Sequence, residues 1–161
     1  MGAANAPVSM FQEWRATAVG EGESAEKTVT VPGKPEGLSG ADGVTYVTNF
    51  DDPREESDDV AVLSLRGLFA HAEVDVTGER LDGEGVAEHD AYFEPLRIPF
   101  RPFDENELSV TCYTPRDRFG GLHDTDAVPE AARVPGIWWD AALESQPLPY
   151  VDRIRVRPAV T

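Results

Sequence analysis

Apolar residues recur with the two-residue period of β-strands through the stretch 59–103, and this pattern constrains the fold more than any other part of the sequence. Val60–Leu65 is almost continuously apolar, which predicts a strand covered on both faces, and Gly67 ends it. The next segment predicts a half-buried strand with one apolar face. That face consists of Ala72, Val74 and Val76. Gly78 then predicts a turn, and a Gly/Asp/Glu-rich excursion leads to a further strand. Its apolar positions are Tyr92, Leu96, Ile98 and Phe100.

Similar alternation covers much of the remaining chain and predicts further strands. Their apolar faces are Trp14, Ala16 and Ala18; Val29 and Val31; Val44, Tyr46, Thr48 and Phe50; and Leu108, Val110 and Cys112. Closing strands are expected over 137–143 and 151–156, the latter with Ile154 and Val156 facing inward. About nine short strands with polar turns and no long helix predict an all-β fold, an antiparallel jelly-roll β-sandwich.

The length of 161 residues predicts one domain, which we place at 11–161, preceded by a disordered arm at 1–10. The chain is too short for a (β/α)₈ barrel, which takes about 250 residues. The N-terminus has no export signal and no segment approaches the length of a membrane-spanning helix, so we expect a cytoplasmic protein with no membrane partner.

The formal net charge of −16 comes with an unusual set of cations, because only Lys27 and Lys34 are lysines among 14 basic residues. The acidic residues are spread along the whole chain, which favours adaptation to a salt-rich cytoplasm, as in a halophile, over an acidic tail or a cation-binding role. This field excludes nucleic acid as an expected ligand.

Chemical groups that could form a catalytic or metal site are sparse. Cys112 is the one cysteine and lies on the apolar side of its strand, which predicts a buried, inert thiol. His71, His89 and His123 lack the spacing of a metal-binding set, and we expect no metal and no cofactor. The acidic loops carry no EF-hand pattern but leave a structural Ca²⁺ open. No nucleophile elbow or reactive Cys/His pair is present in the sequence.

Several short motifs occur in an order that resembles one known family. They are Trp14, the VPG at 31–33, Tyr46 with Phe50, RGLFAHAEVDVTGERL, HDAYFEPLRIPF, ENELSV and PGIWWDAALE. Together, over roughly residues 11–158, they resemble the N-terminal sugar-binding-like domain of family 2 glycoside hydrolases, the group of β-galactosidases, β-glucuronidases and β-mannosidases. The resemblance implies a galactose-binding-domain-like jelly roll over 11–161, with His89 in a turn.

In that family the hydrolytic pair of glutamates lies on a separate barrel, which this sequence does not include. The resemblance therefore implies a non-catalytic, carbohydrate-binding-like module, no enzyme on its own, that supports β-glycoside hydrolysis by a catalytic barrel domain or partner chain. The implied ligand is a carbohydrate at a weak or shared site. The alternative is a free-standing β-sandwich that binds a protein partner and has no sugar role.

The resemblance also nominates binding residues. Asp117 follows the strand at 108–112, where β-galactosidases of the family carry an aspartate that hydrogen-bonds substrate hydroxyls. His123, Asp124 and Asp126 lie further along the same long loop. Asp117 is flanked by two arginines, so a surface ion pair is the alternative for this residue. Trp138 and Trp139 are adjacent, which points them to opposite faces of a strand, with one in the core and the other, which we take as Trp139, free to stack on a sugar or a neighbouring domain.

Overall fold

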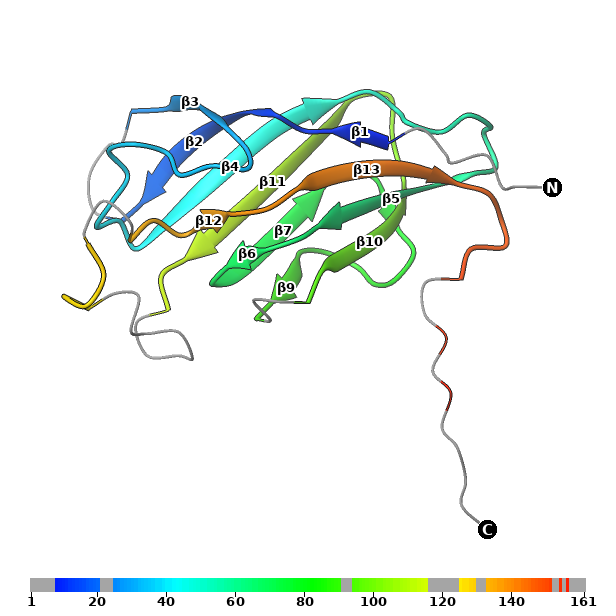
Figure 1. Cartoon of the computed structure of the whole chain (residues 1–161). Helices are drawn as coiled ribbons and strands as arrows, with labels where there is room; N and C mark the ends of the chain where they lie inside the picture. Colours follow the sequence, from blue (N-terminus) through cyan, green and yellow to red (C-terminus); the bar gives the residue numbers. More distant parts are fainter. Residues whose placement is uncertain are drawn as a thin grey trace, which may run out of the picture.

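The computed structural model describes residues 8–20, 25–90, 94–115, 125–129, 133–151, 154 and 156. Over this part of the chain the regular structure is entirely β, with thirteen strands, all paired antiparallel. Two sheets lie in layers and form the predicted jelly-roll sandwich (Figure 1). The strands outnumber the predicted nine because several contain only two or three residues. No helix in the described residues is long and apolar enough to cross a membrane.

The first sheet has the order β1-β13-β5-β10-β8. Its strands are β1 (Val8–Met10), β13 (Ala141–Gln146), β5 (Val60–Leu65), β10 (Leu96–Arg101) and β8 (Glu79–Arg80). All six residues of β5 are buried, as its continuous apolar sequence predicted. The pairing of Val8–Met10 with β13 places the start of the sandwich before the predicted boundary at residue 11, so these residues do not belong to a disordered arm.

The second sheet has the order β3-β2-β4-β11-β7-β9. Its strands are β3 (Lys27–Thr30), β2 (Glu13–Val19), β4 (Gly43–Phe50), β11 (Asn106–Tyr113), β7 (His71–Val76) and β9 (Ala87–His89). A two-stranded sheet pairs β6 (Leu68–Phe69) with β12 (Gly136–Ile137). His89 ends strand β9, which corrects the expectation that it lies in a turn.

The core forms between the two sheets from the side chains that the alternation assigned to it. Trp14, Tyr46, Leu108 and Val110 of the second sheet and Leu63 and Ile98 of the first are at most 1% exposed. At one end of the core, edge-to-face aromatic contacts join neighbouring rings at centroid distances of 5.7–6.0 Å. These contacts link Trp14 to Phe11, Phe11 to Phe50, and Phe50 to Phe100.

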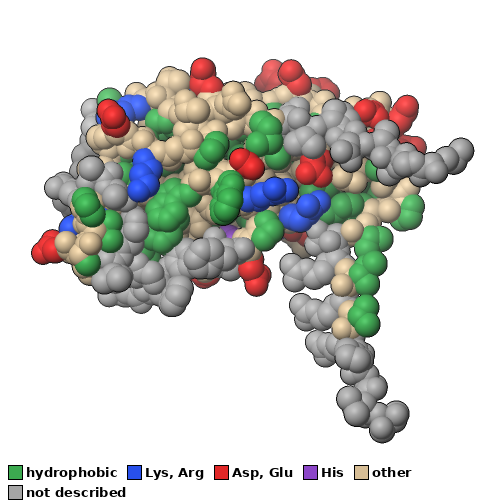
Figure 2. Space-filling model, in the orientation of Figure 1, with side chains coloured by type: hydrophobic (Ala, Val, Ile, Leu, Met, Phe, Trp, Pro, Cys, Tyr) green, Lys and Arg blue, Asp and Glu red, His purple; other side chains and the backbone are tan. Residues whose placement is uncertain are grey.

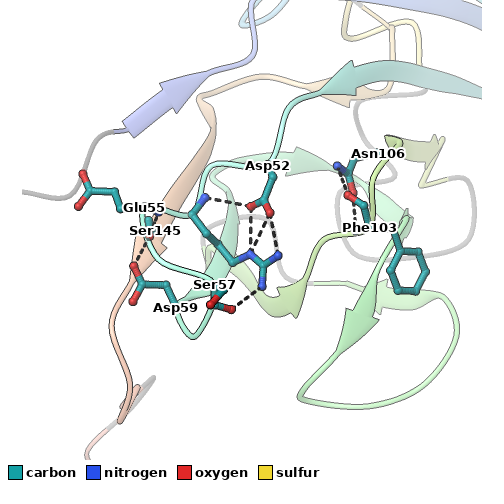
Figure 3. A network of polar contacts seen from close by, with 8 residues as sticks. Asp52, Glu55, Ser57, Asp59, Phe103, Asn106 and Ser145 are labelled. Atoms are coloured by element: carbon teal, nitrogen blue, oxygen red, sulfur yellow. Dashed lines mark hydrogen bonds and ion pairs between the residues drawn. The ribbon is translucent and has the colours of Figure 1, made fainter.

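The charged segment after β4 is a specific turn held by polar contacts (Figure 3). Arg54 makes a two-pronged contact with Asp52 (Nε to Oδ1 3.0 Å, an Nη to Oδ2 2.7 Å), which lowers the pKa of that carboxyl. Ser145, which is 2% exposed, donates to Asp59 (2.9 Å) and accepts from the backbone N–H of Glu55 (3.3 Å). The turn is therefore tied to β13 rather than simply solvated.

Two predicted closing elements differ from the structure. The expected strand 137–143 is interrupted between β12 and β13, so that both tryptophans lie between strands. At the end of the chain, Ile154 and Val156 are 80% and 82% exposed, and neither they nor Val151 belong to a strand. β13 already pairs with β1 on one side and β5 on the other, so it offers no free edge to these three residues.

Candidate functional site

The residues nominated for sugar binding fall into two groups. Asp117, His123 and Asp124 lie outside the described residues, and their predicted role stays a prediction. Asp126 and Trp139 are described. Asp126 lies in the loop between β11 and β12, and Trp139 lies between β12 and β13. The two residues contact different parts of the chain.

The loop that carries Asp117 starts from a fixed point at the end of β11. Tyr113, the last residue of this strand, pairs with Gly43 of β4 and His71 of β7. The next residue, Thr114, donates its backbone N–H (2.9 Å) and its hydroxyl (3.2 Å) to the carbonyl oxygen of Asp42. The chain therefore leaves the sheet at a defined position beside the start of β4.

Asp126 lies in a small turn, closed by a hydrogen bond from the N–H of Val128 to the carbonyl oxygen of Thr125 (3.0 Å). Its carboxylate accepts a hydrogen bond from an Nη atom of Arg133 (3.2 Å), and Nε of Arg133 donates to the carbonyl oxygen of Val128 (2.7 Å). The Asp126 side chain is fully exposed. Asp126 is therefore one partner of a surface ion pair, and this pair connects the turn to Arg133.

Trp138 and Trp139, which we call the aromatic ledge, lie outside the main core. Trp138 stacks on Phe69 at a centroid distance of 4.1 Å with 14° between the rings, and its Nε1 donates to the carbonyl oxygen of Val134 (3.3 Å). Trp138 is 37% exposed and Trp139 65%, so neither is fully buried in the core as expected of one of them. Trp139 is the described residue with the aromatic surface most open to a sugar ring or another protein.

Gly67 fixes the position of this ledge. It has φ +111°, a conformation that side-chain-bearing residues rarely adopt, and an added Cβ would lie 3.0 Å from Cβ of Trp139. Its carbonyl oxygen accepts the N–H of Trp138 at 2.8 Å. On the face shown in Figure 2, hydrophobic side chains gather over β12, with Lys and Arg side chains beside them.

A hydrogen bond from a buried tyrosine holds the backbone that leads to the aromatic ledge. Tyr46 of β4, which is 1% exposed, donates to the carbonyl oxygen of Pro135 (3.0 Å), directly before β12. Gly136 lies against this ring, because a Cβ there would collide with the Tyr46 hydroxyl. Burial raises the pKa of Tyr46, so that the hydroxyl keeps the proton it donates.

A second polar cluster, which no motif of the sequence indicated, lies where β7 begins and β11 ends. Nδ1 of His71 is 2.7 Å from Oδ1 of Asp90, and the His71 ring stacks on Tyr113 at 5.8 Å. Tyr113 donates to Oε2 of Glu73 (3.1 Å). The pKa of Tyr113 is raised mainly by partial burial and, to a lesser extent, by this hydrogen bond. The side-chain alternation did place His71 and Glu73 on one face, but only the strand register brings Tyr113 beside them.

The part of the chain that the structure describes contains no cluster of three or more His, Cys, Asp or Glu side chains that could hold a metal ion. His71 contacts Asp90, and His89 lies on the edge strand β9. What this end of the sandwich offers is an exposed aromatic surface with polar groups on fixed strands.

The sequence matches no protein-family model and no curated protein. The structure, however, is similar to solved glycosidases. A β-glucuronidase from an uncultured Clostridium species aligns with 100% of this chain at a TM-score of 0.68 and 17% identity. A β-D-mannosidase from Dictyoglomus thermophilum aligns with 88% at a TM-score of 0.64 and 16% identity. A GH2 β-galacturonidase from Eisenbergiella tayi, bound to glycerol, aligns with 88% at a TM-score of 0.60 and 21% identity.

The chain spans only a quarter to a third of the length of these enzymes, 32%, 23% and 24% respectively. At such identities the likeness concerns the fold. This chain therefore has the β-sandwich fold of one part of these glycosidases, and the remaining two thirds or more of such an enzyme are not in it.

Proposed function

We propose that this chain is a non-catalytic, carbohydrate-binding-like module that corresponds to the N-terminal domain of a family 2 glycoside hydrolase. The observation that carries the proposal is the match of nearly the whole chain to a minor part of such enzymes. The motifs from Trp14 to the PGIWWDAALE segment support it, because they follow the family's order. The module would support β-glycoside hydrolysis by a catalytic barrel, in the same protein or in a partner chain, in the cytoplasm of a halophile.

Within this proposal, Asp117 reaches into the sugar site of the barrel and accepts hydrogen bonds from sugar hydroxyls. The anchoring of Thr114 on Asp42 supports this role, because it gives the loop a fixed origin only three residues before Asp117. His123, Asp124 and Asp126 would assist from the same loop, and Trp139 would offer its exposed ring face. The alternative for Asp117 is an ion pair with Arg116 or Arg118.

The isolated chain should not hydrolyse nitrophenyl β-galactosides, β-glucuronides or β-mannosides, since the proposal places the catalytic pair on the barrel. The test is turnover by the purified 161-residue chain. Turnover that survives purification and disappears when one acidic residue is replaced would overturn the non-catalytic assignment.

Asp117→Ala, made in a parent protein that contains the barrel, should weaken sugar affinity by about 1.5–3 kcal/mol, the size of a hydrogen bond to a charged group, and leave the melting temperature nearly unchanged. Asp104→Ala is the matched control, because Asp104 is an exposed aspartate in the turn that precedes β11, at the other end of that strand. Unchanged kinetics and inhibitor binding for Asp117→Ala would reject the assignment of Asp117.

A free-standing protein-interaction module is the second candidate, and exposed apolar side chains favour it. Trp139, Val151, Ile154 and Val156 are all more than 60% exposed. Such surface is common where another protein packs. A longer reading frame that encodes a barrel after Thr161 would favour the glycosidase module, whereas a protein partner bound by a chain with no barrel would favour the second candidate.

A further inference from the structure

The outer face of the second sheet has an uncharged centre, although the chain as a whole is strongly acidic. Strands β2, β4, β11 and β7 lie side by side (Figure 1), and alternate side chains of each strand enter the core while the others point away from the sandwich. In the middle of this outer face, five neighbouring positions carry no charge and are only partly exposed: Thr17, Thr45, Val47, Ser109 and Thr111. This neutral patch spans three adjacent strands, β2, β4 and β11.

Acidic residues are abundant elsewhere in the chain, particularly in the turns. The turn 51–59 contains six of them among nine residues, and the excursion 79–90 contains five among twelve. Within the neutral patch, the hydroxyl oxygens of Thr45 and Thr111 lie 2.9 Å apart and hydrogen-bond each other. Because these two groups satisfy each other, the patch can be covered by a second surface at a lower free-energy cost than a region crowded with carboxylates.

A row of register partners crosses this face and ends in opposite charges. In the strand order β2, β4, β11, β7, the row consists of Arg15, Val47, Ser109 and Asp75. Register partners in an antiparallel sheet project to the same side, so these four side chains share the outer face. Asp75 is exposed, and among the described residues no ion pair includes it. The row thus has a positive end, an uncharged middle and a negative end.

A row with this order of charges is complementary to its own copy. We consider two facing sheets and a two-fold axis that lies between them and runs along the strands, between β4 and β11. This axis places β2 of one copy over β7 of the second copy, and β4 over β11. Arg15 then faces Asp75 of the second copy on both sides of the axis. In the next row, which runs from Thr17 to Glu73, these two residues face each other across the copies. Over these four strands, no carboxylate in the two rows faces another carboxylate.

The size and shape of the face fit a weak, reversible dimer. The four central strands contain six to eight residues each. Together with β3 and β9 they give an outer face of roughly 600 Å², at about 3.4 Å per residue and about 4.8 Å between strands. Two such faces bury about 1,200 Å² in total, the lower limit for a specific, stable interface. Facing sheets pack about 10 Å apart, a gap that an arginine side chain can span.

We propose that a second copy of this chain binds to the outer face of the second sheet, so that two sandwiches pack sheet against sheet and Arg15 of each copy pairs with Asp75 of the other. A second copy is the occupant that fits, because its row carries the same charges in the reversed order. The contact uses groups of this chain alone, so it depends neither on a sugar site nor on a catalytic barrel. The net charge of −16 per copy opposes association in dilute buffer, whereas high salt screens this repulsion and screens a pair enclosed between two sheets much less.

The test is sedimentation equilibrium of the 161-residue chain in roughly 2 M KCl, with circular dichroism to show that the chain is folded. The mean molar mass should rise from that of the monomer towards twice that value as the concentration increases from about 5 to about 500 μM, the range for a weak dimer. A chain that stays monomeric over this range would overturn the proposal.

Charge exchange identifies the surface. Arg15→Asp and Asp75→Arg should each weaken dimerisation about tenfold or more, because each variant places like charges face to face at both symmetry-related contacts. An equimolar mixture of the two variants should dimerise again, since every facing pair in the mixed dimer is opposite in charge. Val47→Glu, which introduces a carboxylate into the neutral patch, should also weaken dimerisation.

Two variants on other surfaces serve as controls. Arg101→Asp makes the same charge change as Arg15→Asp at an exposed position on β10 of the other sheet, and Trp139→Ala removes the exposed ring of the aromatic ledge. Both should dimerise like the wild type, and Arg101→Asp should not restore association when it is mixed with Asp75→Arg. The proposal fails if Arg101→Asp matches Arg15→Asp in either experiment, or if Trp139→Ala abolishes the dimer while the variants of the second sheet retain it.

Discussion

Cys112 shows at the scale of one residue how strand alternation controls chemistry. It lies near the end of β11 with 0% exposure, and its strand partners are Val44 of β4 and Ala72 of β7. Burial raises the pKa of the Cys112 thiol to about 12, so that little thiolate forms near neutral pH. The inert thiol expected from the sequence is buried as predicted.

We expect Cys112 to resist alkylation by iodoacetamide at pH 8 while the chain is folded, and to react fully in guanidinium chloride. The reagent attacks the thiolate, which is both rare and out of reach in the native core. Mass spectrometry of the intact chain gives the measurement directly because the sequence has one cysteine. Rapid labelling of a chain that circular dichroism shows to be folded would contradict the burial.

The same residue predicts a loss of stability at alkaline pH. The pKa of Cys112 in the folded state, about 12, lies above its ordinary value of 9.0, so the stabilisation is complete below pH 9 and is lost as the pH rises from 9 towards 12. This one group lowers the free energy of unfolding by up to about 1.4 kcal/mol per pH unit in that window. Urea unfolding at pH 8 and pH 10.5 should show a smaller decrease for Cys112→Ala than for the wild type; equal decreases would reject the linkage.

At the scale of elements, β1 shows how a short strand escapes prediction. Three residues leave little room for alternation, and their partners lie more than 130 positions away, with Met10 opposite Ala142. A backbone hydrogen bond from Phe11 to Ala141 (3.0 Å) continues the contact. The strand covers the outer edge of β13, which would otherwise be unpaired.

Deletion of residues 1–10 should therefore lower the free energy of unfolding by about 1–3 kcal/mol, because several backbone hydrogen bonds of roughly 1 kcal/mol each are lost. Deletion of residues 1–7 is the matched control, since it leaves β1 intact. Both truncated chains start with an added Met and are compared by urea unfolding. If they prove equally stable, β1 contributes nothing to the sandwich.

The segment 151–156 illustrates the reverse case, a convincing pattern without a strand. Its apolar residues alternate with arginines in the sequence, yet Ile154 and Val156 are almost fully exposed. Alternation indicates that a segment can present one apolar face, but burial requires a free sheet edge to receive it. Ile154 and Val156 lie outside any strand, and β13, already paired on both sides, offers no free edge to them.

At the scale of the whole molecule, the charge imbalance dominates. The chain carries 30 acidic against 14 basic side chains. Among the described residues, both partners are exposed in the ion pairs of Arg15 with Glu26 (3.8 Å) and Glu107 (3.4 Å) and of Arg101 with Glu79 (3.7 Å). Exposed pairs of this kind contribute little to stability, typically below about 1 kcal/mol. Mutual repulsion of the remaining carboxylates is consequently only weakly relieved in dilute buffer.

The melting temperature should rise by about 5 °C or more between 0.1 M and roughly 2 M KCl, because the Debye length falls from about 10 Å to below about 3 Å and the carboxylate repulsion is screened. Thermal unfolding followed by circular dichroism supplies the measurement. A non-ionic osmolyte at equal osmolality is the control, since it changes hydration without screening charge. A melting temperature that does not change with KCl would contradict salt adaptation.

Some features of the candidate site follow from the local sequence, and others depend on contacts between residues far apart in the chain. The adjacency of Trp138 and Trp139 indicated that one ring would be exposed, and Trp139 is 65% exposed. Their position outside any strand could not be predicted, because it depends on Gly67 and Phe69, about seventy residues earlier in the chain. For Asp126, the sequence indicated an acidic loop residue but not its partner Arg133.

The sequence by itself determined which residues form the main strands and which of their faces are buried, because side-chain direction along a strand is a local property with a period of two. It correctly assigned β5, β7, β4 and β11 and the place of Cys112 in the core. Only the tertiary structure decided what lies beside what: β1 against β13, and Tyr113 beside His71. These outcomes depend on sheet edges and chain reversals that join distant residues, and no local period encodes them.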